Sequence, residues 1–291
     1  MLVIVGAVVV ILSVLGGYLF EGGNLLVLIQ PAELIIIGGA AVGSMLIATT
    51  PTVLKALGGQ LGGLLGTGLT KDDFADLLVM LYKLFRQIQQ GGVMSIESHL
   101  EKPAESAIFG KHAKFLGRHH SLDFLADSMK VIIVGGINAH DLDALMEEDL
   151  KVHHDVEGKP AAMLTKVGDA MPGLGIVAAV LGIVITMGAI DGPPSEIGEH
   201  VGAALVGTFL GILMSYGFIQ PLAGAMEARV AADGKYEECM RAGIMAVYKG
   251  LPPAIAIEFA RRVLPSEVRP SFDETEKLCR AAKSGPEAAA A

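Results

Sequence analysis

The sequence predicts an all-α integral membrane protein with four transmembrane helices, a helical cytoplasmic domain between the second and third, and a helical C-terminal cytoplasmic tail. Two long apolar blocks contain no basic residue, because all 22 Lys and Arg residues lie between Lys55 and Lys166 or between Arg229 and Lys283. Each block can hold two helices of about 20 residues, the length that crosses the hydrocarbon core. The other segments show the 3.6-residue period of helices and no convincing strand pattern.

Charge and hydropathy describe different parts of the chain. The net charge of −9 and pI near 5.4 are typical of a soluble acidic protein, whereas a mean hydropathy of +0.55 and 52% hydrophobic residues indicate a membrane protein. Short loops rich in Lys and Arg stay on the cytoplasmic side. We therefore expect a multi-pass protein of the bacterial inner membrane, with both termini in the cytoplasm and domains at residues 1–50, 51–168, 169–228 and 229–291.

The first two expected crossings are Leu2 to Phe20 and Glu33 to Thr49. The first run lacks the positive start of a signal peptide and is interpreted as a retained helix. The third and fourth crossings are Asp169 to Ile190 and Val201 to about Met226. The short loop inside each block has no Lys or Arg and is expected outside the cytoplasm.

The middle segment predicts a small helical domain. Thr70 is a good N-cap with Asp73 three positions later, and one apolar stripe follows, made of Phe74, Leu77, Leu78, Leu81, Leu84, Phe85 and Ile88. Further helices are expected at about Leu122 to Val134 and Asp141 to His153. The Gly-rich stretch Gly58 to Gly68 is interpreted as a flexible link, since no Gly-Lys-Ser/Thr follows that would indicate a phosphate loop.

The tail predicts two shorter helices, Glu237 to Tyr248 and Ile255 to Val263, and a frayed Ala-rich end from Lys283 onward. Cys239 and Cys279 fall in expected cytoplasmic segments, where thiols stay reduced. No disulfide, metal site or cofactor is expected.

The expected crossings contain no Asp, Glu, Lys, Arg or His between their flanking positions, although ion pathways through bilayers usually need such a residue. If the chain conducts ions, another subunit must supply the carboxylate. Pairs of small residues four positions apart occur at three places: Gly39 and Gly43, Gly175 and Ala179, Gly207 and Gly211. Any single pair can serve helix packing within the chain, whereas the three pairs together favour an assembly of several subunits. Pro172 and Pro221 each indicate a kink, a hinge or a carbonyl exposed to a wet pathway.

Several short stretches of the sequence resemble those of a known protein family. The stretch Ala170 to Gly182, with Met-Pro-Gly-Leu-Gly-Ile-Val-Ala-Ala inside it, resembles the third crossing of the MotA family of flagellar motor stator subunits. The likeness extends in order over nearly the whole chain, including the strings at Gln30 to Glu33, Val206 to Leu213, Gln220 to Ala223 and Arg269 to Phe272.

The resemblance implies a pentameric ring of these chains in membrane lipid, around two copies of a MotB-type partner whose single crossing carries an essential aspartate. Proton flow through that complex would drive torque on a flagellar rotor switch-complex protein. By this likeness the chain is no enzyme, needs no cofactor beyond the coupling proton and binds no nucleic acid.

Residue by residue, Pro172 and Pro221 match prolines that couple ion flow to conformational change, and Thr208 matches a hydroxyl near the ion site. Ala179 stands where sodium-driven members have a threonine, and sodium needs oxygen ligands, so protons are favoured. Glu97 matches the acidic member of the family's pair of rotor-contacting charges.

The basic member of that pair is missing, because Gln89 stands where the family has an arginine. Arg86, three residues earlier on the same helix face, is predicted to provide the positive charge.

Several alternatives remain at this point. An ExbB or TolQ type energiser of outer-membrane processes shares the ion-ring principle but is expected to have three crossings. A sodium-driven stator would differ only in its coupling ion. A secondary transporter would show inverted repeats with broken helices and polar groups at the midplane, and neither is evident. A structural scaffold would have no use for hydroxyl positions such as Thr208.

Overall fold

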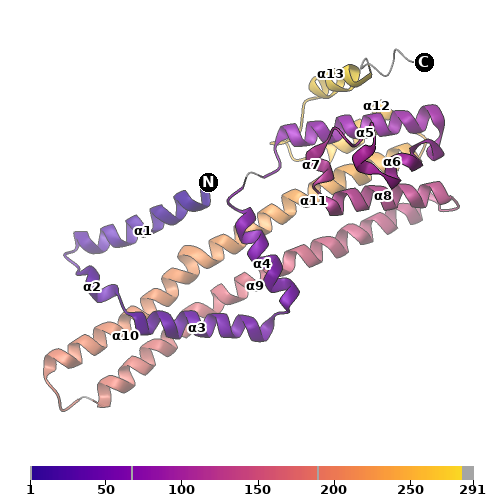
Figure 1. Ribbon diagram of the computed structural model, residues 1–291. Helices are drawn as coiled ribbons and strands as arrows, with labels where there is room; N and C mark the ends of the chain where they lie inside the picture. Colours follow the sequence, from indigo (N-terminus) through magenta and orange to yellow (C-terminus); the bar gives the residue numbers. More distant parts are fainter. Residues whose placement is uncertain (1, 67, 189, 284–291) are drawn as a thin grey trace. The chain divides into compact units, whose positions relative to one another are not determined.

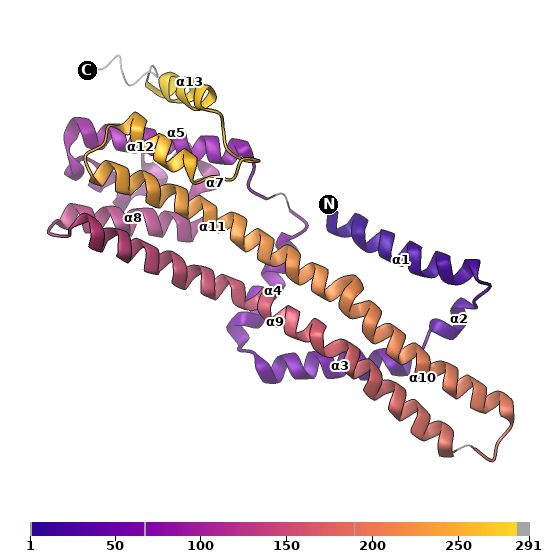
Figure 2. The same ribbon diagram turned by 180° about the vertical axis from the view of Figure 1, so that it is seen from behind.

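The computed structural model describes residues 2–66, 68–188 and 190–283, and in that part the chain contains helices and no strand (Figures 1 and 2). The described residues within Met1–Gly66 and Glu157–Arg229 form one compact unit, and those within Thr67–Val156 and Val230–Ala291 form a second. Within these described residues, four helical spans are long and apolar enough to cross a membrane. This confirms an all-α chain with four membrane-length helices. The end beyond Lys283, expected to be frayed, lies outside the described residues.

The first unit consists of complete helices from the N-terminal part of the chain, one further complete helix, and parts of two longer ones. The complete helices are α1 (Leu2–Phe20), α2 (Leu25–Leu28), α3 (Pro31–Ala48), α4 (Pro51–Gly63) and α10 (Pro194–Met214); the longer helices are α9 (Ala139–Gly188) and α11 (Gln220–Tyr248). Helix α3 packs against α10, and the chain between α10 and α11 is a π-helical turn, Ser215–Ile219.

Helix α3 begins two residues before the expected crossing. Pro31 occupies the start of the helix, where its missing N–H costs nothing and its fixed φ suits the helix. Glu33 therefore lies inside the first helical turn and not in a flanking loop. The membrane-length span that includes this helix runs from Leu25 to Ala48.

Helix α4 corrects the expectation of a flexible link. The chain is helical from Pro51 through Gly63, although four of its 13 residues are glycine. Leu57 packs in a cluster with α9 and α11 residues, among them Leu164 and Met226. The amide of Gln60 donates to the backbone oxygen of Glu157 at 2.9 Å and to its carboxylate at 3.0 Å. These tertiary contacts outweigh the low helix propensity of glycine.

The second unit is built from shorter helices around a shared core. They are α5 (Lys71–Gly91), the 3₁₀ turn η1 (Val93–Ile96), α6 (Glu97–Glu101), the 3₁₀ turn η2 (Pro103–Glu105), α7 (Ala113–Leu116), α8 (His119–Val134), α12 (Pro253–Arg262) and α13 (Phe272–Lys283), with parts of α9 and α11. Helix α8 begins three residues before the expected start at Leu122.

Helix α5 confirms the predicted stripe and cap. Thr70 and Asp73 form a capping box, in which each side chain accepts from the backbone N–H of the other residue. Phe74 and Phe85 are 2% and 0% exposed, and the leucines between them are buried in the same core. Gly92 ends the helix with a φ of +75°, which favours glycine.

Two helices are longer than predicted. The sequence suggested a helix from Asp141 to His153 and a separate crossing from Asp169, but α9 is continuous over 50 residues and contains Pro160 and Pro172. The helix expected at Glu237 to Tyr248 is likewise the end of α11, which has 29 residues. The prolines of α9 do not end the helix, because a neighbouring helix can compensate for the backbone hydrogen bond that is lost at a proline.

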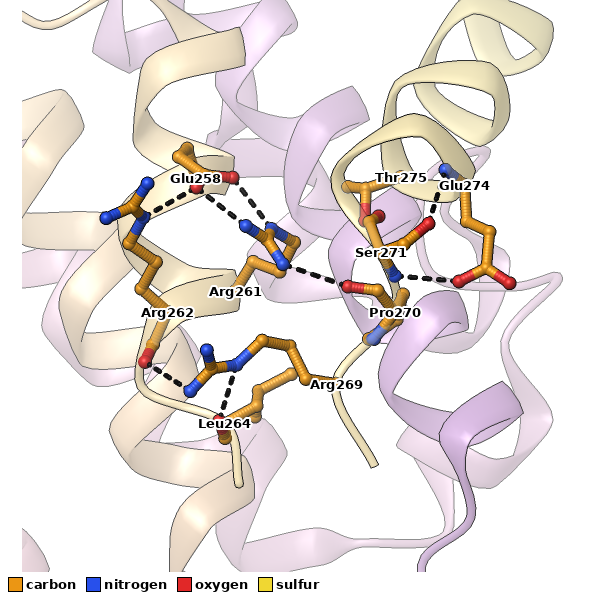
Figure 3. A network of polar contacts seen from close by, with 9 residues as sticks. All are labelled: Glu258, Arg261, Arg262, Leu264, Arg269, Pro270, Ser271, Glu274 and Thr275. Atoms are coloured by element: carbon orange, nitrogen blue, oxygen red, sulfur yellow. Dashed lines mark hydrogen bonds and ion pairs between the residues drawn. The ribbon is translucent and has the colours of Figure 1, made fainter. Parts of the chain in front are cut away.

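Figure 3 shows the hydrogen bonds by which Arg269 and Ser271, in the Arg-Pro-Ser-Phe string, hold the connection between α12 and α13. Arg269 donates to the backbone oxygens of Leu264 at 2.8 Å and Arg262 at 3.2 Å, which closes the connection after α12. Ser271 then caps α13, since its N–H donates to the Glu274 carboxylate at 2.7 Å and its hydroxyl accepts from the Glu274 N–H at 3.1 Å.

Glu258 joins two arginines in the same network. Arg261 binds both of its carboxylate oxygens at 2.7 Å, and Arg262 adds a third contact at 2.7 Å. The hydrogen bonds from Arg261, and then from Arg262, lower the pKa of Glu258 to about 2, against the opposing effect of burial. The stabilisation is therefore complete above the ordinary value near 4.5 and is lost as the pH falls toward 2.

We expect Glu258→Gln to lower the free energy of unfolding by about 1.5–3 kcal/mol at neutral pH, the range for hydrogen bonds to charged groups. The difference from the unmodified chain should shrink as the pH falls from 4.5 toward 2. Thermal unfolding of the detergent-solubilised protein, followed by circular dichroism, measures it. Glu276→Gln is the control, because it removes an exposed ion pair with Arg280. Equal shifts for both variants would contradict the prediction.

Candidate functional site

The four residues proposed for the ion pathway all belong to the first unit. Pro172 and Ala179 lie on α9, Thr208 lies on α10, and Pro221 lies at the start of α11. Pro172 and Ala179 are seven residues apart, which places them on one face of the helix. Gly175 lies between them, and a Cβ atom there would be 3.3 Å from Cα of Thr208. Three of the four residues thus gather where α9 and α10 touch.

The contact between α9 and α10 is a backbone contact made possible by glycines. A Cβ atom on Gly175 would lie 2.9 Å from the backbone oxygen of Gly207, and one on Gly211 would lie 2.7 Å from the backbone oxygen of Met171. These small residues serve packing within the chain. Gly39 and Gly43 have no such neighbour within 4 Å.

The faces beside this contact remain open in the single chain. Ala179 and Thr208 are half-buried, while Ile176, Val180 and Val184 on α9 are exposed, the last at 62%. Exposed large apolar side chains in membrane-length helices require lipid or another helix as a neighbour. The candidate pathway residues therefore border surfaces that a further subunit can cover.

Pro172 does not leave an exposed carbonyl. Because proline has no N–H, the helical donor for the backbone oxygen of Gly168 is missing. The hydroxyl of Ser215, which is fully buried, donates to that oxygen at 2.6 Å. The idea that this carbonyl faces a wet pathway is wrong, and a side chain 47 residues away compensates for the proline.

Pro221 lies two residues after the end of the π-helical turn. At the end of that turn the N–H of Gln220 donates to the backbone oxygen of Ser215, the i to i−5 bond of a π-helix. The side-chain amide of Gln220 donates to Asp169 on α9 at 2.7 Å. Single π turns inside α-helices occur frequently at functional sites. The turn and the two prolines thus occupy the same part of the first unit.

Glu33 is a functional candidate that the sequence analysis missed, because it was treated as a flanking residue. Its side chain is 5% exposed, and one carboxylate oxygen, Oε2, has no hydrogen-bond partner among the described residues. A Cβ atom on Gly207 would lie 2.4 Å from that oxygen. Pro31 was the available signal, since a proline at the start of a helix places Glu33 within the first turn.

The buried carboxyls of the second unit differ from Glu33 because they have partners. Asp73 accepts from Lys114 at 2.5 Å and from Thr70 at 2.8 Å. Burial raises the pKa of Asp73, but these hydrogen bonds outweigh it and lower the pKa overall. Glu237 accepts from the Ser121 hydroxyl at 2.5 Å. Among the described residues, no three His, Cys, Asp or Glu side chains form a metal-binding group.

The rotor-contact candidates lie close together in the chain of the second unit. Arg86 and Gln89 are on α5, half-buried and exposed respectively, and Glu97 is exposed at the start of α6. The turn η1, which joins the two helices, packs against α5 and leads directly to Glu97. Among the described contacts, neither Arg86 nor Glu97 forms an ion pair within the chain. Both charges are therefore available to another molecule.

Comparison with known families and proteins gives a consistent result. Residues 4–92 match the family described as motility protein A N-terminal, and residues 117–235 match the MotA/TolQ/ExbB proton channel family. Motility protein A of Escherichia coli (strain K12) is 41% identical over 288 residues, which cover 98% of this chain and 97% of that protein. Chemotaxis protein LafT of Vibrio parahaemolyticus is 36% identical, covering 94% and 96%.

Two solved structures share the fold. The chain superposes on a chain of C. jejuni MotAB with a TM-score of 0.74 and 20% identity, covering 91% of this chain and 96% of that one. It superposes on a chain of the flagellar MotAB stator complex from Bacillus subtilis with a TM-score of 0.73 and 22% identity, covering 92% and 98%.

Proposed function

The chain belongs to the motility protein A family and is a flagellar motor stator subunit, and from that premise we propose that it forms a proton-conducting complex with a MotB-type partner. The observation that supports this most strongly is the likeness to E. coli motility protein A over nearly the full length of both chains. In this proposal the chain makes no covalent intermediate and uses no cofactor. It converts the proton motive force, about 2.3 kcal/mol per charge per 100 mV, into torque.

The proposed placement has both termini and the second unit in the cytoplasm, facing a rotor switch-complex protein. The distribution of Lys and Arg supports this orientation, since the two short loops within the apolar blocks have none. Several copies, by family likeness five, would surround the single crossing of the partner and contact membrane lipid on their outer faces. The exposed apolar residues of α9 are consistent with such neighbours.

An energiser of the ExbB or TolQ type is disfavoured by the N-terminal part of the chain. Residues 4–92 match a family specific to motility proteins, whereas the later match is shared with ExbB and TolQ. Four membrane-length helices also exceed the three expected for that alternative.

Protons are the proposed coupling ion because of Ala179. Its methyl group lies beside the α9–α10 contact and cannot replace the oxygen ligands that a sodium ion loses with its hydration shell. Pro172 and Pro221, with Thr208, are proposed to couple proton transfer to movement of α9 and α11. A sodium-driven stator is the alternative that the experiment below separates.

Swimming speed provides the test, in cells whose only stator contains this chain and its partner. We expect a protonophore to stop the cells, and we expect speed to stay constant when sodium is replaced by potassium at fixed pH. The same strain carrying a sodium-driven stator is the control for both media. Speed that rises with sodium concentration and survives the protonophore would establish sodium coupling instead.

A further inference from the structure

The most unusual side chain of the first unit is Glu33. Among the described residues of that unit it is the only carboxyl with less than 9% of its surface exposed. It lies in the first turn of α3, a helix otherwise made of apolar and small residues with one serine. A buried ionisable group in a membrane-length helix is costly and marks a functional position by default.

The carboxyl occupies a slot between three helices. Gly207 of α10 forms one wall, because a Cβ atom there would be 2.4 Å from Oε2 of Glu33 and 3.1 Å from its carboxyl carbon. The same Cβ atom would lie 3.4 Å from the methyl group of Ala178 on α9. The absence of a side chain at Gly207 is what makes room for the carboxyl group. Thr208, the proposed ion-site hydroxyl, is the next residue of α10.

Nothing within the described part of the chain neutralises or solvates Oε2. It has no hydrogen-bond partner among the described residues, and Glu33 makes no described ion pair. The helices packed around it carry other ionisable residues, and none of them is a described hydrogen-bond partner of Oε2. They are Glu196, Glu199 and His200 on α10 and, in the part of α9 that belongs to this unit, Glu157, Lys159, Lys166 and Asp169. The nearest along the chain to Gly207, His200, is seven residues away, about 10 Å along the helix.

The residues that line the slot determine which cation can accompany the Glu33 carboxylate. An unpaired carboxylate in apolar surroundings is strongly disfavoured, so a cation must accompany the charge. A metal ion would need several oxygen ligands, and the described walls of the slot are a glycine and an alanine methyl group. A proton needs only Oε2 itself and converts the carboxylate to a neutral acid.

We propose that Glu33 is a proton-binding site belonging to this chain, which holds a proton as a carboxylic acid at the α3–α10 contact and releases it to the proton pathway. The proposal rests on the proposed proton-driven function and adds a second titrating carboxyl to the one expected from the partner. It also corrects the interpretation that the membrane helices of this chain contribute no ionisable group.

Glu33→Gln provides the test, because the amide has nearly the same shape and cannot carry the proton. In the purified full-length complex with its partner, infrared difference spectra between alkaline and acidic pH should lose one carboxylic acid band. In cells, rotation speed at low load should fall several-fold at equal membrane abundance. Glu33→Asp should restore part of both signals. Glu21→Gln, an exposed acid in the loop before α2, is the matched control and should change neither.

The outcomes separate this proposal from the proposed function. An unchanged infrared spectrum in Glu33→Gln would overturn the binding site, even if the motor is proton-driven by the protonophore test. Equal slowing by Glu33→Gln and Glu33→Asp, without a spectral change, would show a packing role and also overturn it. Gly207→Ala gives an independent check, since its methyl group overlaps Oε2 and should displace the carboxyl and slow rotation.

Discussion

Replacing Gly211 by valine is expected to abolish motility. A Cβ atom at this position would lie 2.7 Å from the backbone oxygen of Met171 and 2.9 Å from Cα of Gly175. Both neighbours are backbone atoms of α9, so no side chain can rotate away, and the two helices must separate. Overpacking of this kind costs about 1–3 kcal/mol or more. The separation would also displace Thr208, one turn away on α10.

Swimming in soft agar and the membrane abundance of the chain measure this effect. Gly173→Val is the matched control, because Gly173 is an exposed glycine of α9 where an added Cβ atom would have no neighbour within 4 Å. We expect that variant to swim. Normal swimming by Gly211→Val would show that the close contact between α9 and α10 is not required in the working stator.

Reversing the charge of Glu97 is the second change with a large expected effect. Glu97 is exposed and unpaired among the described contacts, so we expect Glu97→Lys to leave the fold intact. In the proposed function this change replaces attraction to a rotor cation by repulsion. We expect tethered cells of Glu97→Lys to produce no torque. Arg86→Ala should lower torque several-fold if, as predicted from the sequence, Arg86 takes the place of the positive charge missing at Gln89.

Glu148→Lys is the control for charge reversal, since Glu148 is an exposed acid of α9 on the same unit and pairs only weakly with Lys151 at 3.8 Å. It should rotate normally. If Arg86→Ala leaves torque unchanged while Glu97→Lys abolishes it, Arg86 does not replace the family arginine. Lys83, one helical turn before Arg86, would then be the next residue to change.

The sequence was most informative where polar and apolar residues alternate with a helical period. On α5 the capping box and the stripe from Phe74 to Phe85 were both read correctly, because one apolar face and one polar face specify the direction of burial. Helix α3 offers no such contrast, since nearly every side chain is apolar. Which residue faces α10 depends on the small residues of the partner helix, and the burial of Glu33 was therefore missed.

Helix lengths were underestimated for a related reason. Pro172 was read correctly as a break in hydrogen bonding, but the donor that repairs it, Ser215, lies on another helix 47 residues away. Gly58 to Gly68 were read as flexible from their propensity, whereas the contacts of Leu57 and Gln60 fix the first part of that stretch, to Gly63, in helix α4. Both errors arose where contacts distant in sequence override a local preference.

The π-helical turn at Ser215–Ile219 is closed by a hydrogen bond between residues five apart, and it therefore contains one residue more than a turn of α-helix. If that residue were absorbed into regular helix, every side chain beyond Gln220 would swing by about 100° around the axis and advance by about 1.5 Å. Helix α11 continues without interruption to Tyr248, so such a change of register would be carried along its whole length as a twist. A small local rearrangement next to Pro221 would thereby rotate and advance the rest of helix α11.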